Sequence, residues 1–291
     1  MSGLRRAGTG WAFIGPSTLV ILGLSIFPAG WAWILSQQRW NGFSKPRNIG
    51  WRNYQAMLDD ESLRAAVLHT AFYTALFVPA SVLAGLFIAI ALNRQIRFIG
   101  FYRTCVFVPF VASSTAIGIL ANYIFDPQFG FANTVIRSLG LPVQKFLEDP
   151  RQAMLVIAAM TLWSGLGFTV VVYLAALQDI QKDLIEAAVV DGASKLQVFR
   201  FVVWPELTPV TVFTGIWQLI GALQLFDVVY TTTRGGPLDA TQTIVYFLWD
   251  QAFIQLRFGY GSAVAYGLFA LTLVITLMMV VYSRFAKVRA F

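Results

Sequence analysis

Six segments of this chain contain no Asp, Glu, Lys or Arg, and this segregation of charge limits the fold more than any other feature. They are residues 11–35, 65–92, 104–125, 153–177, 207–226 and 258–283. In helical conformation about 20 apolar residues cross a hydrocarbon layer of about 30 Å, and each segment is at least 20 residues long. The segments are continuously apolar, whereas membrane strands alternate. The sequence therefore predicts an all-α membrane protein with six transmembrane helices, the fifth running to about residue 229.

Composition supports a membrane protein and argues against a disulfide, a thiolate metal site and a nucleic-acid partner. Apolar residues make up 57% of the chain and charged residues 12%, against about 25% charged residues in an average soluble domain. The single cysteine, Cys105, excludes an intrachain disulfide and a thiolate metal site. The net charge of +7 comes from bases at the ends of the spans. Such bases favour contact with anionic lipid headgroups, so we expect no nucleic-acid partner.

The orientation of the chain follows from its first span and from the basic residues. Arg5 and Arg6 precede the first span, but its 25 uncharged residues exceed the apolar region of a signal peptide, about 7–15 residues. It should therefore remain as an anchor. Of the 21 basic residues, eleven lie on the side of the two termini and ten on the other. Those on the terminal side sit in shorter segments close to the span ends, so we expect cytoplasmic termini and one transmembrane domain over residues 1–291.

Catalytic signatures are missing from the sequence. The only histidine is His69, at the edge of the second span, and no metalloprotease, serine-hydrolase or P-loop motif occurs. We therefore expect the chain to be no enzyme and to hold no cofactor of its own. An ion-coupled secondary transporter stays open as an alternative. Such transporters carry ionisable groups within their spans, and Asp227 is the nearest candidate.

A polar insert, residues 178–206, separates the fourth and fifth spans. Its apolar residues recur at helical spacing over Asp183–Asp191, which predicts a short amphipathic helix. Gly192 suits the end of that helix, where a left-handed residue is needed. Leu196, Phe199 and Val203 predict a second short helix that ends near Pro205. Taken alone, this pattern fits a hairpin lying on the membrane better than a knob that binds a soluble partner.

The insert also resembles the EAA motif of the integral membrane subunits of bacterial ABC importers. That family has Glu-Ala-Ala, three residues, Gly, nine residues, Ile, one residue and Leu-Pro. Here Val202 replaces the Ile and Trp204 replaces the Leu, with every spacing intact. The resemblance reverses the preference for a membrane-lying hairpin and makes residues 178–206 a cytoplasmic coupling loop. The residues assigned to ATPase coupling on this basis are Glu186, Ala187, Ala188, Asp191, Gly192, Ala193, Val202 and Pro205.

Other stretches resemble the carbohydrate-uptake branch of this family, and the likeness covers nearly the whole chain. The sequence Thr233–Pro237, which reads TRGGP, resembles the F-type half of maltose transporters and the A-type half of glycerol-3-phosphate transporters. Phe101-Tyr102-Arg103 and Phe226-Asp227 are similar as well. One departure is His69, where the family commonly has Asn.

The resemblance implies the type I permease fold of ABC importers and a multi-pass subunit of the bacterial plasma membrane, in contact with lipid. Its partners would be a second permease subunit in a heterodimer, two ATP-binding subunits and an extracytoplasmic solute-binding protein. ATP and Mg would be bound by the ATPase subunits. The Glu186 helix would dock in a cleft of the ATPase, and ATP binding would switch the pathway between inward- and outward-facing states.

Several polar, aromatic or small residues inside the spans are candidates for the carbohydrate pathway. They are Thr161, Trp163, Gly165, Gln218, Gln224 and Asp227. For each one, packing between helices is the competing explanation. Gln218 lies mid-span and is the candidate for substrate contact, whereas Gln224 and Asp227 should share a helix face at the outer mouth. No Lys or Arg lies in any span, which favours a neutral glycan.

Overall fold

The computed structural model describes residues 13–94 and 97–285, with side-chain detail to Val281. The basic residues Arg5, Arg6, Lys287 and Arg289, which contribute to the predicted orientation, lie outside the described residues. The chain divides into two compact units. Unit 1 comprises Met1–Asp60 and Leu248–Phe269, and unit 2 comprises Glu61–Phe247 and Ala270–Phe291. The prediction of one domain over residues 1–291 stays a prediction.

Five helical segments are long and apolar enough to cross a membrane, which confirms five of the predicted spans. They are Phe13–Ser36, Glu61–Leu92, Ala153–Asp179, Lys195–Thr232 and Phe258–Val281. The first contains a π-turn, η1 (Leu22–Ile26), followed by α2 (Phe27–Ser36) with Pro28 in its first turn. The second is α4 (Glu61–Leu92), the fourth is α8 (Ala153–Asp179), and the last belongs to α14 (Phe258–Phe285).

The third predicted span, residues 104–125, is not the uniform helix that its composition suggested. It consists of α5 (Ile99–Val111) and α6 (Ser114–Ile124), bent by 102° against each other. Pro109 stands in the last turn of α5 and has no backbone N–H to donate. Ser113 then caps the new helix by accepting a hydrogen bond from the backbone N–H of Ala116. With this pair counted as one bent span, the described residues contain six.

The fifth span also departs from the sequence prediction, at both of its ends. α10 (Lys195–Val198), the π-turn η3 (Phe199–Val203) and α11 (Trp204–Leu223) follow one another without interruption, so the second helix of the insert does not end near Pro205. A proline ring clashes with the carbonyl four residues earlier in an α-helix, and the wider π-turn before Pro205 relieves that clash. At the other end, Gln224–Phe226 leave the helix before α12 (Asp227–Thr232).

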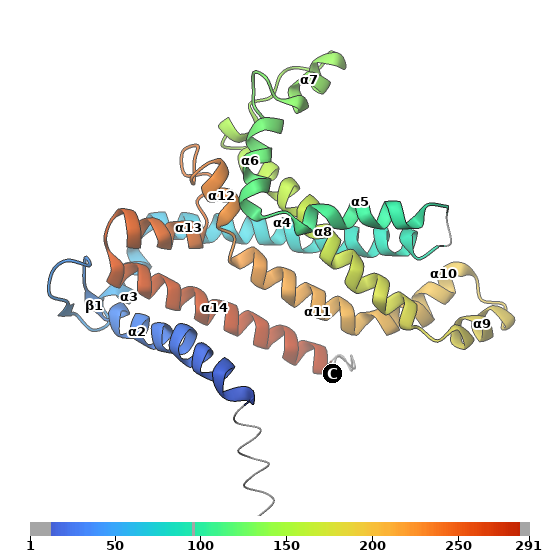
Figure 1. Ribbon diagram of the computed structural model, residues 1–291, viewed down its shortest axis with the longest axis horizontal. Helices are drawn as coiled ribbons and strands as arrows, with labels where there is room; N and C mark the ends of the chain where they lie inside the picture. Colours follow the sequence, from blue (N-terminus) through green and yellow to red (C-terminus); the bar gives the residue numbers. More distant parts are fainter. Residues whose placement is uncertain (1–12, 95–96, 286–291) are drawn as a thin grey trace, which may run out of the picture. The chain divides into compact units, whose positions relative to one another are not determined.

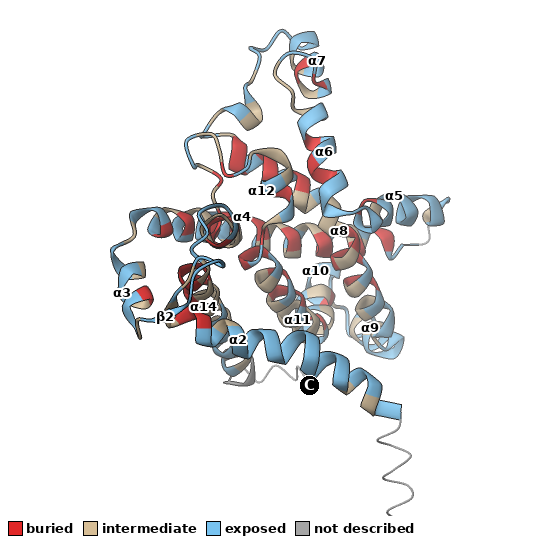
Figure 2. Cartoon of the chain, turned by 60° about the vertical axis from the view of Figure 1, so that its left-hand side comes forward, coloured by how far each residue is buried: buried red, intermediate tan, exposed pale blue. Residues whose placement is uncertain are grey.

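In unit 2, α4, α8 and α11 pack against one another and carry the core. A buried cluster includes Leu86 on α4, Tyr173 on α8 and Leu207 on α11. Gly85 allows close approach, because a Cβ atom added there would overlap the side chain of Thr169. In Figure 2 the buried residues run along these three helices, whereas α2 is almost entirely exposed. Unit 2 also contains α7 (Phe131–Ser138), the 3₁₀ turn η2 (Phe146–Glu148) and the first residues of α13 (Ile244–Trp249).

Unit 1 contains the only strands among the described residues, a short ribbon of β1 (Gln38–Arg39) and β2 (Arg47–Asn48). The strands are antiparallel, and Arg39 faces Arg47 across the ribbon. α3 (Arg52–Asp59) follows, and the π-turn η4 (Asp250–Ile254) leads into α14. The buried amide of Asn53 donates to the carbonyls of Ser36 and Gln38, which ties α3 to the end of α2 and to β1.

Candidate functional site

The predicted coupling helix is present as α9 (Lys182–Val190), displaced by one residue from the predicted range. Glu186 and Ala187 are exposed, whereas Ala188 is half-buried. α9 packs against α10 and η3, so the insert is a folded hairpin of helices and not an extended loop. The role of its residues in coupling stays a prediction.

Gly192 ends α9 in the conformation that its sequence position suggested. Its φ is +82°, in the left-handed region. The N–H of Gly192 donates to the carbonyl of Val189, and the N–H of Ala193 donates to that of Ala188. This pair of bonds is a Schellman motif, in which two terminal carbonyls of the helix are satisfied. The elbow between Asp191 and Ser194 is therefore fixed by backbone geometry.

Sequence reasoning overlooked the residue that starts the next helix. The hydroxyl of Ser194 accepts from the backbone N–H of Gln197, and the side-chain oxygen of Gln197 accepts from the N–H of Ser194. This reciprocal arrangement is a capping box. The signal was present in the sequence as Ser-x-x-Gln at the start of the apolar stripe of Leu196, Phe199 and Val203.

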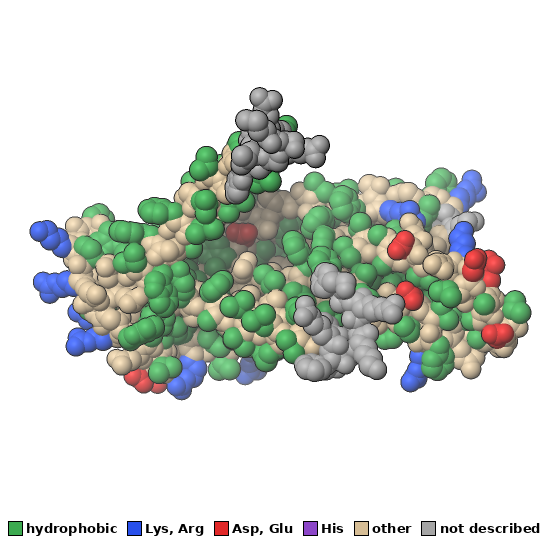
Figure 3. Space-filling view, turned by 90° about the horizontal axis from the view of Figure 1, so that it is seen from below, with side chains coloured by type: hydrophobic (Ala, Val, Ile, Leu, Met, Phe, Trp, Pro, Cys, Tyr) green, Lys and Arg blue, Asp and Glu red, His purple; other side chains and the backbone are tan. Residues whose placement is uncertain are grey.

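The remaining motif positions lie beyond the elbow. Val202 is half-buried in η3, and Pro205 is exposed in the first turn of α11. Large apolar side chains stand exposed around the motif: Leu184, Val189, Val190, Leu196 and Phe201. Figure 3 shows acidic, basic and hydrophobic side chains together at the right-hand edge of the view, where α9 and α10 lie. Exposed apolar groups next to charges are typical of a protein-binding surface.

A cavity of about 350 Å³ lies within unit 2 and brings together five of the six candidate pathway residues. These are Thr161, Gly165, Gln218, Gln224 and Asp227. Trp163 does not line the cavity, and 44% of its surface is exposed. A volume of this size accommodates a small solute or part of a larger one.

Gln218 packs between helices, the explanation that the sequence could not distinguish from substrate contact. Its side chain is only 7% exposed, and its amide nitrogen donates to the hydroxyls of Ser81 and Thr169. These two hydroxyls lie 3.3 Å from each other. The three side chains come from α11, α4 and α8, so Gln218 joins the three core helices of the unit while also lining the cavity.

The helical argument that related Gln224 to Asp227 is wrong, because no helix connects them. Gln224 ends α11, and Phe226 has φ −137° and ψ −58°, outside the helical region. Asp227 then begins α12. Both side chains nevertheless line the same cavity as Gln218. The break gathers residues at one site that an unbroken helix would have spread around its axis.

Both interruptions of the spans occur at this cavity. Ala112 and Ser114 flank the bend between α5 and α6, and Leu225 and Phe226 lie in the break between α11 and α12. All four line the cavity. Irregular backbone at membrane depth is tolerated where it lines a cavity. It exposes backbone N–H and C=O groups that a continuous helix would use in its own hydrogen bonds.

Aromatic rings form much of the wall, and sequence reasoning had not identified them. Tyr73 stacks on Phe77 with ring centroids 5.2 Å apart, and its hydroxyl donates to Thr161 at 2.9 Å. Phe110 lines the cavity as well. Its ring belongs to a series of neighbouring rings that continues through Phe168 to Trp217, with centroids 5.8 Å and 5.3 Å apart. No sequence signal separates such rings from ordinary core residues within an apolar span.

Asp227 is the only charged residue among the sixteen that line this cavity. The remaining polar groups are hydroxyls and amides. Across the described ranges, no three His, Cys, Asp or Glu residues are grouped so that they could hold a metal ion. His69, which departs from the family pattern, lies outside the cavity, and its Nδ1 is 3.3 Å from the carbonyl oxygen of Gln242. The site therefore suits a solute recognised by hydroxyls, amides and ring faces.

Comparison with known proteins gives a consistent result. Residues 81–288 match the model of the family described as binding-protein-dependent transport system inner membrane component. A probable ABC transporter permease protein of Pyrococcus horikoshii is 31% identical over 91% of this chain and 92% of its own length. The lactose transport system permease protein LacF of Rhizobium radiobacter is 32% identical over 94% of this chain and 91% of its own. A chain of a bacterial alginate ABC transporter shares the fold, with a TM-score of 0.84, 20% identity and coverage of 97% and 96%.

The network around Gln218 predicts a loss of stability on mutation. Gln218→Leu removes both interhelical hydrogen bonds, each worth about 0.6 kcal/mol and at most about 1.7 kcal/mol within a membrane. We expect a lower midpoint of thermal unfolding in detergent, together with reduced uptake. Gln224→Leu is the control, because Gln224 lines the same cavity at the end of α11 and should keep wild-type stability. Unchanged stability of Gln218→Leu with lost uptake would show that the amide contacts only substrate.

Proposed function

Because the chain belongs to the family of binding-protein-dependent transport system inner membrane components, we propose that it forms half of the pathway of an ABC importer for a carbohydrate. A permease of this family is a transport component, and the chemistry of the cavity bears on what is carried. The cavity in unit 2 is the observation that carries the proposal, since its lining matches the surface of a sugar.

A carbohydrate offers hydroxyl groups and apolar C–H faces. The hydroxyls and amides of the cavity, including Thr161, Ser164 and Gln224, supply donors and acceptors for the first. The rings of Tyr73, Phe77 and Phe110 supply flat apolar surfaces for the second. The similarity to a lactose permease subunit supports the same substrate class. The absence of a lining base favours a neutral sugar over a phosphorylated one.

The remaining subunits follow from the architecture of such importers. We expect a second permease subunit, two ATPase subunits that bind ATP and Mg, and an extracytoplasmic solute-binding protein. The hairpin of α9 and α10 would dock on an ATPase through its exposed apolar residues and Glu186. The Schellman motif at Gly192 holds the hairpin rigid, so movement of the ATPase would reach α11 through the uninterrupted run from Lys195 to Leu223.

The ion-coupled alternative has little in the site to support it. Asp227 is the only carboxylate among the residues that line the cavity, and it stands in the first turn of α12, where an acid is favoured by the helix dipole. Family membership favours ATP as the energy source.

The substrate class is tested by uptake into vesicles that contain the reconstituted complex and its binding protein. We expect ATP-dependent uptake of the sugar that co-purifies with the binding protein. Phe110→Leu should reduce uptake about two- to tenfold, because a ring contact is worth about 0.5–1.5 kcal/mol. Phe72→Leu, an exposed aromatic position on α4 outside the cavity, should leave uptake unchanged. Recovery of an amino acid or a peptide from the binding protein would refute the carbohydrate assignment.

The coupling role of the hairpin is tested by Gly192→Val. Gly192 has φ +82°, and an added Cβ would have no atom within 4 Å, so we expect the valine to act through the backbone. We expect strain of about 1–3 kcal/mol and loss of substrate-stimulated ATPase activity, with the complex still inserted. Gly192→Asn should retain activity, since Asn tolerates the left-handed region.

A second pair of variants separates coupling from general destabilisation. Glu186→Lys should weaken association with the ATPase by reversing an exposed charge. Gly50→Val imposes the same kind of strain at φ +60° in unit 1, also without neighbours. It should lower stability without uncoupling. Normal ATPase stimulation in both Gly192→Val and Glu186→Lys would remove the coupling assignment.

Orientation is tested by cysteine labelling in a Cys105→Ser background. The cysteines replace Asn48, Ser194 and Leu238, which are all exposed. With cytoplasmic termini, an impermeant thiol reagent added to intact cells should label Asn48→Cys and Leu238→Cys but not Ser194→Cys. Labelling of position 194 without permeabilisation would reverse the proposed topology.

A further inference from the structure

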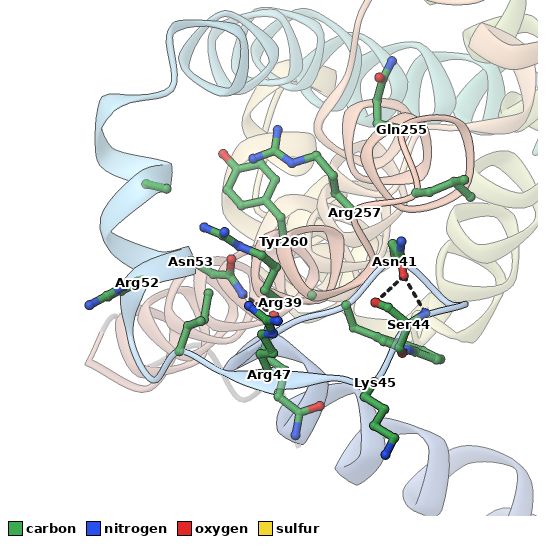
Figure 4. A pocket seen from close by; sticks show the side chains of 16 residues that line it. Arg39, Asn41, Ser44, Lys45, Arg47, Arg52, Asn53, Gln255, Arg257 and Tyr260 are labelled. Carbon is green, nitrogen blue, oxygen red and sulfur yellow. Dashed lines mark hydrogen bonds between the residues drawn. The ribbon is translucent and has the colours of Figure 1, made fainter.

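A second cavity, of about 690 Å³, lies within unit 1 and carries a strongly positive lining. Five of its sixteen lining residues are basic and none is acidic. The bases are Arg39, Lys45, Arg47, Arg52 and Arg257. Figure 4 shows them around the cavity together with Asn41, Asn53 and Tyr260. This composition is the opposite of that in unit 2, where the cavity is lined by one acid and no base.

Two of these arginines stand directly opposite each other. Arg39 on β1 and Arg47 on β2 are partners in the antiparallel register. Like charges in that position destabilise a ribbon. Within the described part of the chain, neither guanidinium makes a hydrogen bond or an ion pair with another side chain. An anion between the two would convert the repulsion into two charge-assisted hydrogen bonds.

The frame that holds the bases is well ordered by its own hydrogen bonds. Asn41 accepts from the backbone N–H groups of Phe43 and Ser44 and from the Ser44 hydroxyl, which closes the loop between the two strands. The indole N–H of Trp40 donates to the carbonyl of Ser44 at 2.8 Å. On the opposite wall, the Arg257 guanidinium donates to Gln251 and lies over the ring of Tyr260, 4.6 Å from its centroid. The loop that carries Lys45 and the side chain of Arg257 are therefore held in place before any ligand arrives.

The cavity lies at the ends of two helices that are able to cross a membrane. α2 ends at Ser36 and α14 begins at Phe258, and the lining begins two residues after the first and includes Gly259 of the second. An aromatic cluster adjoins these ends: Trp33, Trp51, Tyr54 and Tyr266 have neighbouring rings with centroids 5.0–6.3 Å apart. Trp and Tyr gather at the level of lipid headgroups. The same helix α2 exposes Phe27, Trp31 and Ile34, which offer an apolar surface for acyl chains.

We propose that this cavity binds the phosphate of an anionic phospholipid. Arg39 and Arg47 would hold the phosphate oxygens, with Arg257 completing the site and Lys45 and Arg52 contributing positive potential. Five bases without an acid favour a headgroup with net negative charge over a zwitterionic one. The apolar flank of α2 distinguishes a lipid from a free phosphate ion or an acidic segment of a protein partner, neither of which has acyl chains to place there. The inference does not depend on which solute is transported.

The test uses the purified transporter complex, stripped of lipid and then equilibrated with an equimolar mixture of phosphatidylglycerol and phosphatidylcholine. Tightly retained lipid is extracted and quantified by mass spectrometry. We expect enrichment of phosphatidylglycerol in the wild-type complex and a loss of that enrichment by about tenfold or more in the Arg39→Gln, Arg47→Gln double variant. The control is Arg137→Gln with Arg151→Gln, two exposed arginines of unit 2 whose loss changes the net charge equally. Equal enrichment in the double variant and the wild type would overturn the proposal.

Two further arms identify the source of the anion and guard against misfolding. Inorganic phosphate at millimolar concentration should not displace the retained lipid, and displacement would instead indicate a site for a soluble anion.

If the double variant loses the solute-binding protein but keeps its lipid enrichment, the cavity serves a protein partner and the proposal fails. Arg39→Lys with Arg47→Lys retains the charge without the guanidinium fork, and we expect it to keep the fold and show intermediate enrichment. If the Lys variant elutes as an intact complex and keeps wild-type enrichment, positive charge alone binds the lipid. If it elutes intact and loses all enrichment, the guanidinium geometry is required. If the wild type shows no preference for phosphatidylglycerol, the proposed lipid site is wrong in either form.

Discussion

The structure depends first on the need to satisfy backbone hydrogen bonds in a layer that contains no water. This need makes helices the only form available to the long apolar segments. Where a helix stops at membrane depth, the free groups need another partner. At the bend between α5 and α6, Ser113 accepts from the N–H of Ala116. At the end of α11, Gln224 donates its N–H back to Ile220 and Gly221. Both breaks line one cavity, so the backbone groups that are hardest to satisfy are gathered at one place in unit 2.

The helices of unit 2 are held together by close fit and hydroxyl groups, because lipid tails are as apolar as the side chains they contact. Gly85 brings α4 against Thr169 of α8. The amide of Gln218 joins Ser81 and Thr169 from the third helix. Gln218 therefore belongs both to the packing of the unit and to the wall of the cavity. Functional and structural roles for such a residue are distinguished by comparing stability with uptake, since either role alone would account for its buried position.

Charge is confined to the ends of the spans, and the two charged regions have different character. The hairpin of α9 and α10 mixes acids and bases with exposed apolar side chains, as a protein-binding surface does. The cavity of unit 1 collects bases alone, with Arg39 facing Arg47. Repulsion between paired like charges is tolerated where a counter-ion is supplied from outside. We propose a partner protein for the first region and an anionic headgroup for the second.

The sequence by itself determined five of the membrane-spanning helices, the presence of a helical hairpin in the insert and the left-handed glycine at position 192. All three depend on local properties: continuous apolarity, helical periodicity and a backbone conformation that side chains disfavour. The tertiary structure decided the rest. It alone brings Thr161 of α8 to Gln224 and Asp227, and it alone places Arg39 opposite Arg47. The tertiary structure also decided that the helix continues through Pro205 and that the chain bends after Pro109. Proline removes one hydrogen bond at either site, and neighbouring caps, turns and packing determine whether the chain continues or bends.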